Sequence, residues 1–331
     1  MDYIQIKDTD IKPVSRIGLG SWAIGGWLWG GTEEHDAINT ILAALERGIN
    51  LIDTAPIYGH GKSEELIGKA ISIYGRREDV VIATKAGLDW DENNVKRDSS
   101  KRRILKELDD SLKRLNTDYI DIYQIHWPDK DTPIGESAEA MLELYNSKKI
   151  RAIGVSNYSP LQMDKFREYA PLHTSQPPFN LFEQSAALDV LPYCHTHGVT
   201  TLTYGTICRG LLSGKIKIDT EFQGDDIRKI DPKFLKPHYE NYLEAVNELD
   251  DLTQERYDKG VLSIAVKWVL DHKGVDIALW GARKPEQLEI VNEVMGWKLD
   301  QEVRLAIERI VKECIPNPIG AEFMAPPNNK T

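Results

Sequence analysis

Short apolar runs alternate with amphipathic stretches along almost the whole chain. The runs are rich in Val and Ile, which is typical of parallel strands that are buried on both faces of a sheet. Eight runs occur, at residues 16–22, 49–53, 80–85, 119–126, 150–157, 172–176, 199–204 and 275–281. This pattern predicts eight parallel strands.

The amphipathic stretches between the runs carry apolar residues near positions i, i+3, i+4 and i+7, as helices do. Clear examples are 33–48, 100–116 and 136–149, and the first ends at Gly48, a residue favoured at helix C-termini. Eight even strand–helix units favour a (β/α)8 TIM barrel over a doubly wound sheet. No change in composition marks a boundary, so we predict a single domain over residues 1–331.

Three segments depart from this rhythm. Residues 1–15 alternate in character and contain turn formers, which predicts an N-terminal hairpin across the bottom of the barrel. Residues 213–237 form a long loop after strand 7 of the barrel, and loops of that length inside a compact domain are usually lids or disordered. The tail at 316–331 is also expected to be irregular.

Composition narrows the class of protein. The net charge of −11 argues against general nucleic-acid binding. The three cysteines are widely spaced and contain no CxxC pair, so we expect a reduced chain with no metal site. We see no secretory signal and no apolar run near the ~18 residues that a membrane span needs. We therefore expect a cytoplasmic protein that binds neither membrane nor nucleic acid.

Polar residues stand at the ends of the predicted strands. The active sites of (β/α)8 enzymes lie at the C-terminal ends of their strands, where these residues would meet. They are Ser21, Asp53, Lys85, His126, Asn157, Gln176, Tyr204 and Gly281, of which only the last carries no hydrogen-bonding side chain. A ring of this kind predicts one polar pocket.

The residue types suggest proton transfer in that pocket. Tyr58 lies in a glycine-bracketed turn after Asp53, and its phenol is a poor acid at neutral pH unless a cation lowers the pKa. Lys85 is the strand-end cation available to do so. Asp53 would pair with Lys85, and His126 would add an orienting donor. Taken one at a time, these residues also fit structural roles: a capping Asp, a snorkelling Lys and a core His.

Several motifs in order along the chain resemble the aldo-keto reductase superfamily, most closely its bacterial family 11. They are GINLIDTAPIYGHGKSEELIG (48–68), ATK (83–85), YQIHWPD (123–129), IGVSNYS (153–159), YGTICRGLLSGK (204–215) and WGARKPEQLE (280–289). The first, with its pattern D-T-A-x-x-Y-G-x-G-x-S-E-x-x-x-G, is highly specific. Together the motifs span nearly the whole chain.

The resemblance implies a catalytic tetrad of Asp53, Tyr58, Lys85 and His126, with Tyr58 as the proton donor, and NADPH/NADP+ as the cofactor. Arg283 is the candidate for the 2′-phosphate. Arg228 in the long loop either covers the cofactor or is an ordinary solvated arginine. The implied cofactor-binding residues are Gly20, Ser21, Trp22, Asp53, Ser156, Asn157, Gln176, Tyr204, Gly205, Thr206, Ile207, Cys208, Arg209, Lys215, Arg228, Gly281, Arg283 and Gln287.

The expected function is the NADPH-dependent reduction of small aldehydes and ketones by a monomer. Two alternatives stay open: a cofactor-binding regulatory subunit resembling the potassium-channel β subunits, and a barrel lyase or isomerase that uses Lys85 as a Schiff base. Trp22, Trp29, Trp90 and Trp127 lie in or near strand-end loops. They either line an apolar substrate pocket or close the mouth of the barrel.

Overall fold

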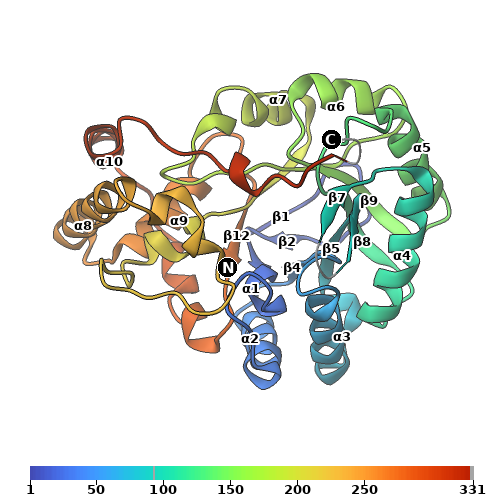
Figure 1. Cartoon of the computed structure of the whole chain (residues 1–331), viewed down its shortest axis with the longest axis horizontal. Coiled ribbons are helices and arrows are strands. Elements are labelled where there is room, and N and C mark those ends of the chain that lie inside the picture. The colour runs from blue at the N-terminus through green and yellow to red at the C-terminus, as the bar shows by residue number, and fades with distance from the viewer. Residues whose placement is uncertain (92–93, 329–331) are drawn as a thin grey trace.

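The eight predicted runs form a closed barrel of parallel strands in the computed structural model, which describes residues 1–91 and 94–328 (Figure 1). The barrel strands are β3 (Ile17–Gly20), β4 (Leu51–Asp53), β5 (Val81–Ala86), β8 (Ile120–Ile125), β9 (Ile150–Ser156), β10 (Thr174–Gln176), β11 (Thr200–Thr203) and β12 (Ile277–Gly281). Each strand pairs with its neighbours in chain order, and β12 closes the ring against β3. The predicted (β/α)8 fold is confirmed.

Helices surround the barrel and bury their apolar faces against its outer surface (Figure 1). They are α1 (Trp22–Gly25), α2 (Glu34–Glu46), α3 (Lys62–Tyr74), α4 (Lys101–Leu115), α5 (Ile134–Asn146), α6 (Pro160–Arg167), α7 (Val190–His197), α8 (His238–Tyr257), α9 (Val261–Leu270) and α10 (Gln301–Cys314). The three helices that we predicted end within a few residues of their predicted bounds. Trp22, which we placed at a strand end, instead begins α1.

The N-terminal hairpin lies where we expected it. Strands β1 (Tyr3–Ile4) and β2 (Val14–Ser15) are antiparallel, and Ile6, Ile11 and Val14 are buried. These side chains pack with inward-facing residues of the barrel strands, such as Leu51 and Val81. The hairpin therefore closes the bottom of the barrel and extends its inner core.

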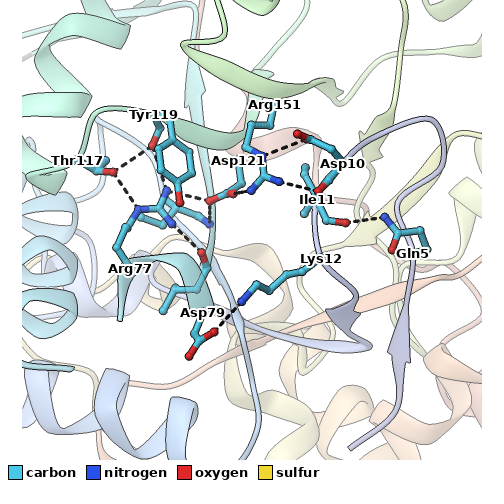
Figure 2. Close-up of polar contacts among 12 residues, drawn as sticks. Gln5, Asp10, Ile11, Lys12, Arg77, Asp79, Thr117, Tyr119, Asp121 and Arg151 are labelled. Atoms are coloured by element: carbon cyan, nitrogen blue, oxygen red, sulfur yellow. Dashed lines mark hydrogen bonds and ion pairs between the residues drawn. The ribbon is translucent and has the colours of Figure 1, made fainter. Parts of the chain in front are cut away.

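A network of charges connects the same end of the barrel to this N-terminal segment (Figure 2). The carboxylate of Asp121, on β8, is almost completely buried and accepts hydrogen bonds from Arg77 and Arg151, both at 2.9 Å. Arg151 also reaches the Asp10 carboxylate, and Lys12 pairs with Asp79 at 2.8 Å. This network is at the end of the barrel opposite the C-terminal ends of the strands, so its role is structural.

The long loop and the tail contain short elements that we did not predict. The loop at 213–237 includes the 3-10 turns η4 (Ile227–Lys229) and η5 (Pro232–Phe234), and the tail includes η8 (Glu322–Met324). The remaining 3-10 turns are η1 (Arg77–Asp79), η2 (Ser185–Ala187), η3 (Cys208–Ser213), η6 (Pro285–Leu288) and η7 (Val291–Val294). In Figure 1 the red tail leaves α10 and runs across the molecule towards β7 (Val95–Arg97). Residues 329–331 of the tail lie outside the described residues.

Candidate active site

The four predicted catalytic residues come together at the C-terminal end of the barrel. Asp53 ends β4 and Lys85 lies in β5, the neighbouring strand, while His126 directly follows β8. Tyr58 lies in the turn between β4 and α3, where Gly59 approaches the backbone of Gly25 closely. A Cβ at residue 59 would meet the carbonyl oxygen of Gly25 at 2.1 Å, so this turn requires glycine after the tyrosine.

Asp53 and Lys85 form a buried ion pair. The Lys85 ammonium donates to Asp53 Oδ1 at 2.7 Å and to the Thr54 carbonyl at 2.9 Å. The second carboxylate oxygen, Oδ2, accepts from Gln176 Nε2 at 2.7 Å, a contact that we did not predict. Burial lowers the pKa of Lys85, and Asp53 opposes that shift. The predicted pairing is confirmed, and it holds the ammonium in a fixed position.

Tyr58 lies between this ion pair and His126. The Lys85 ammonium is 5.1 Å from the centre of the Tyr58 ring, and the His126 ring meets Tyr58 edge-on at 5.9 Å. Burial, assisted by the Asp53 charge, raises the pKa of Tyr58 well above its usual value. Our prediction that Lys85 lowers this pKa is therefore wrong, because desolvation of the phenolate outweighs the attraction of an ammonium already paired with Asp53.

His126 is neutral in this environment. Burial lowers its pKa well below the ordinary value, and the Lys85 charge acts in the same direction. A neutral imidazole offers one N–H donor and one acceptor. It is thus suited to orient a carbonyl oxygen beside Tyr58 without supplying a charge.

A hydrogen-bonded group of amide and hydroxyl side chains adjoins the tetrad. The Ser156 hydroxyl donates to the Gln176 carbonyl at 2.8 Å, and the Asn157 amide donates to Ser156 Oγ and to the His126 carbonyl, both at 3.0 Å. The Tyr204 hydroxyl donates to Asn157 Oδ1 at 2.9 Å. These hydrogen bonds fix the side chains of Ser156, Asn157 and Tyr204 in one arrangement.

Two cavities meet at Tyr58. The first has about 960 Å³ of empty space, including its open mouth, and the second about 840 Å³ on the same measure, so both fall in the range of ligand pockets. The residues that line both are Trp22, Tyr58, Tyr204 and Met324. The first cavity has three arginines in its wall, whereas the second is mostly apolar. A proton donor is therefore in the wall shared by a basic cavity and an apolar one.

Comparison with known proteins identifies the family. The model of the aldo/keto reductase family matches residues 16–312. The chain belongs to this family. It is 57% identical over 330 residues to the aldo-keto reductase YhdN of Bacillus subtilis (strain 168), covering 100% of this chain and 99% of the relative. It is also 35% identical over 305 residues to the NADH-specific methylglyoxal reductase of Escherichia coli (strain K12), covering 87% and 91%.

A solved structure agrees with this assignment. The glycerol dehydrogenase AKR11B4 from Gluconobacter oxydans superposes with a TM-score of 0.87 at 52% identity, covering 98% of this chain and 99% of that one. The resemblance to family 11 is thereby confirmed. As a member of the family, the protein is an oxidoreductase that reduces carbonyl groups and uses a nicotinamide cofactor.

The basic cavity of this aldo/keto reductase contains most of the residues that we predicted to bind the cofactor. They are Gly20, Ser21, Trp22, Asp53, Tyr204, Gly205, Thr206, Ile207, Arg209, Arg228, Gly281, Arg283 and Gln287. A further three predicted residues, Ser156, Asn157 and Gln176, line the apolar cavity. A Cβ added at Gly281 would meet only open space, and Arg283 supplies positive charge, whereas the Arg228 guanidinium is paired with Asp226. The wall thus fits an elongated anionic dinucleotide.

Two predicted cofactor contacts lie elsewhere in the reductase. The Cys208 side chain is completely buried in the core, and Lys215 lies on the exposed chain beyond the turn. The chain kinks within η3, where Cys208, Arg209 and Gly210 all have positive φ. Arg209 and Gly210 line the cavity, whereas the Cys208 side chain enters the core.

Arg209, which the family resemblance placed among the cofactor-binding residues, is part of a buried charge cluster. Its guanidinium donates to Glu183 at 2.7 Å and to Asp231, and Lys233 pairs with the same Glu183 carboxylate at 2.8 Å. These four charged groups are buried and compensate one another. Arg209 therefore lines the cavity while its charge is neutralised by two carboxylates.

The glycine-rich first loop, residues 25–31, is fastened to the long loop. Asp225 accepts from the backbone N–H groups of Leu28 at 2.7 Å and Gly30 at 3.0 Å. Arg228 lies over the Trp29 ring at 5.2 Å, and Arg283 donates to the Trp29 carbonyl at 2.7 Å. Arg228 is thus an ordered part of the cavity wall rather than a solvated loop residue.

From the sequence, we expected four tryptophans either to line a substrate pocket or to close the mouth of the barrel. Three of them line a cavity and one does not. Trp22 lines both cavities, Trp29 the basic one and Trp127 the apolar one. Trp90 lines neither and packs beside the apolar cavity against His60. We missed the contribution of the tail, whose Met324, Pro326 and Pro327 also line the apolar cavity. No sequence pattern pointed to it, because the tail has neither periodicity nor a motif.

Lys85 lines neither cavity, which argues against Schiff-base chemistry. Within residues 1–91 and 94–328, no group of three or more His, Cys, Asp or Glu side chains could hold a metal ion. In the same part of the chain, none of the helices has the length and hydropathy needed to cross a membrane.

Proposed function

We propose that this protein is an NADP(H)-dependent reductase that converts aldehydes and ketones to alcohols, with Tyr58 as the proton donor. The observation that carries this proposal is the position of Tyr58 between the basic and the apolar cavity. A dinucleotide in the first and a carbonyl compound in the second would meet beside the phenol.

The cofactor, when bound, supplies the hydride that the carbonyl carbon receives. The residues of the chain supply the rest. The basic cavity would hold most of the dinucleotide. Its carboxamide would extend into the apolar cavity, where Ser156, Asn157 and Gln176 are donors and acceptors, with Tyr204 against the nicotinamide ring. Tyr58 donates its proton to the carbonyl oxygen, and the new alcohol leaves with one added hydride and one added proton. Positioned proton donors of this kind contribute roughly 100- to 10,000-fold to rate.

The other tetrad residues support Tyr58. Asp53 holds Lys85 at 2.7 Å, and the ammonium lies near the phenol ring, where it stabilises the negative charge that develops on Tyr58 as the proton leaves. Neutral His126 would donate to the same carbonyl oxygen and orient it. The raised pKa of Tyr58 keeps the phenol protonated until the substrate arrives.

The preference for NADPH over NADH is proposed from Arg283, with Lys284 beside it. Arg283 lies in the wall of the basic cavity, and a guanidinium fork suits the oxygens of a 2′-phosphate. A relative with 35% identity is named as NADH-specific, so the family name alone does not carry this preference. The single domain, the monomeric state and the cytoplasmic location stay predictions.

The Arg283→Ala variant tests the cofactor preference. We expect it to weaken NADPH binding by roughly 1–3 kcal/mol, as for the loss of a charged hydrogen-bond partner, and to leave NADH binding nearly unchanged. Dissociation constants for both cofactors, measured by quenching of protein fluorescence, give the comparison. Arg309→Ala is the matched control, because Arg309 lies exposed on α10. Equal losses for both cofactors in Arg283→Ala would remove Arg283 from the 2′-phosphate.

A further inference from the structure

A segment of the C-terminal tail pairs with the hairpin that follows β5 and lies beside it like a third strand. Strand β6 (Leu88–Trp90) pairs antiparallel with β7 (Val95–Arg97). On the other side of β7, the backbone N–H of Arg97 donates to the Pro327 carbonyl at 3.0 Å, and Arg97 forms a parallel bridge with Asn328. The hairpin and the tail are therefore one structural unit, although they are far apart in the sequence.

The side chain of Arg97 fastens this unit to a third segment. Its Nε donates to the Pro326 carbonyl at 2.7 Å, and its Nη1 donates to the Pro128 carbonyl at 2.8 Å. The guanidinium also lies over the Trp127 ring at 5.3 Å. A planar guanidinium holds its donors at fixed angles to one another, whereas the donors of an ammonium rotate. Arg97 thus sets the separation of the tail from the loop after β8.

All three segments form walls of the apolar cavity, but Arg97 does not line it. The hairpin contributes Leu88 and Val95, the loop after β8 contributes Trp127, and the tail contributes Pro326 and Pro327. Among residues 1–91 and 94–328, no Lys, Arg, Asp or Glu lines this cavity. The cavity therefore matches a neutral substrate with an apolar or aryl body, and its width depends on segments that Arg97 joins.

We propose that Arg97 is a positioning residue that determines specificity: by holding the tail against Trp127, it shapes the apolar cavity for neutral carbonyl compounds with an extended aryl or alkyl body. This inference rests on the proposed reductase function. A substrate with such a body contacts the walls that Arg97 holds, whereas a small carbonyl compound reaches Tyr58 without them. Loss of Arg97 should therefore affect the two kinds of substrate differently.

The test compares Arg97→Met, which keeps an unbranched side chain about as long as the Cβ–Nε stem of Arg97 but has no donors, with Arg97→Lys and with the exposed control Arg309→Met. The substrates are 4-nitrobenzaldehyde, which is extended, and methylglyoxal, which is small. For Arg97→Met we expect KM for 4-nitrobenzaldehyde to rise about tenfold, with kcat within about twofold of wild type. KM for methylglyoxal and the Kd for NADPH should stay within about twofold, and Arg97→Lys should recover part of the loss. Equal increases in KM for both substrates would overturn the proposal.

Hydrogen exchange provides a readout that does not depend on turnover. The amide of residue 97 is retained in Arg97→Met and is protected only while the tail is seated on β7. We expect this amide to exchange faster in Arg97→Met than in wild type or Arg309→Met. Unchanged exchange would show that the tail stays in place without the guanidinium, which would overturn the proposal. If wild type binds NADPH but reduces neither aldehyde, the proposed function fails, and the exchange result still decides whether Arg97 holds the tail.

Discussion

At the scale of single residues, the chemistry depends on keeping a buried phenol protonated. Tyr58 is largely desolvated and has Asp53 nearby, and both effects raise its pKa. The charge of Lys85 does not reverse this shift, because the ammonium is shared with a carboxylate at 2.7 Å. The phenol is therefore protonated at neutral pH, which is the form that carbonyl reduction requires, whereas alcohol oxidation requires the phenolate.

The two directions of the reaction should therefore respond differently to pH. The pKa of Tyr58 lies above 10 and that of His126 lies below 6.5, so neither group titrates between them. We expect kcat/KM for aldehyde reduction to vary less than about threefold from pH 6.5 to about 9. Alcohol oxidation, which needs the phenolate, should become faster as pH rises through that range. Both profiles come from initial rates in buffers of constant ionic strength.

A fall in the reduction rate within that range would contradict this assignment. It would mean that an essential acid with an ordinary or lowered pKa loses its proton there. Tyr58 would then have the lowered pKa that the sequence alone suggested.

The positions of the site residues were easier to predict from the sequence than their pKa values. Asp53 and Lys85 end neighbouring parallel strands, so their meeting follows from the order of the strands. The pKa of Tyr58 did not follow, since it depends on how completely the surrounding loops exclude water. Gln176, the second partner of Asp53, lies 123 residues away in the sequence, and its distance from Asp53 depends on the curvature of the closed barrel.

At the scale of elements, the two ends of β8 have different roles. The C-terminal end leads into the catalytic site, and the N-terminal end contributes to the stability of the barrel. His126 follows its C-terminal end, whereas Asp121 near its N-terminal end binds Arg77 and Arg151 (Figure 2). Asp121 also accepts from the backbone N–H of Ile82 on β5 at 2.9 Å. The carboxylate thus joins β5, β8 and β9 at the bottom of the barrel.

The Asp121→Asn variant should lose stability but not activity. Removal of the charge leaves the partly buried guanidinium of Arg77 without its carboxylate and leaves Arg151 with only the exposed Asp10, which we expect to cost about 2–4 kcal/mol of unfolding free energy. The kcat and KM of the folded enzyme should stay within about twofold of wild type, because the catalytic residues are at the other end of the barrel. Urea unfolding followed by circular dichroism measures the loss.

Asp118→Asn is the control for this experiment, since Asp118 is exposed shortly before the same strand. It should unfold within about 0.5 kcal/mol of wild type. A comparable loss in both variants, or no loss in Asp121→Asn, would show that the buried ion pairs do not stabilise the barrel.

Elements with strong periodicity were predicted well and short elements were not. Helix α4 follows its apolar pattern from the Ser100 N-cap to Asn116, which has left-handed backbone geometry, and both ends were close to prediction. Strands β6 and β7 have three residues each, too few for a repeating pattern. The pairing of β7 with the tail joins Arg97 and Pro326, which are 229 residues apart, and no local signal encodes such a contact.

At the scale of the whole molecule, a site built from eight strand ends is assembled by closure of the barrel. The order of the strands fixes which polar groups face one another, so the tetrad and most of the cofactor wall were predictable. The apolar cavity was not, because its walls come from the first loop, the hairpin, the long loop and the tail. Loops vary in conformation far more than the barrel that supports them. Substrate choice consequently depends on the part of the molecule that sequence patterns describe least.

The central claim is that Tyr58 gives the proton for carbonyl reduction. Its most direct test is the single-turnover and steady-state reduction of 4-nitrobenzaldehyde with NADPH by wild type and Tyr58→Phe. We predict that kcat falls by at least about 100-fold in Tyr58→Phe while the Kd for NADPH stays within about twofold. A Tyr58→Phe enzyme with the kcat of wild type would contradict the account, because another group would then be the proton donor.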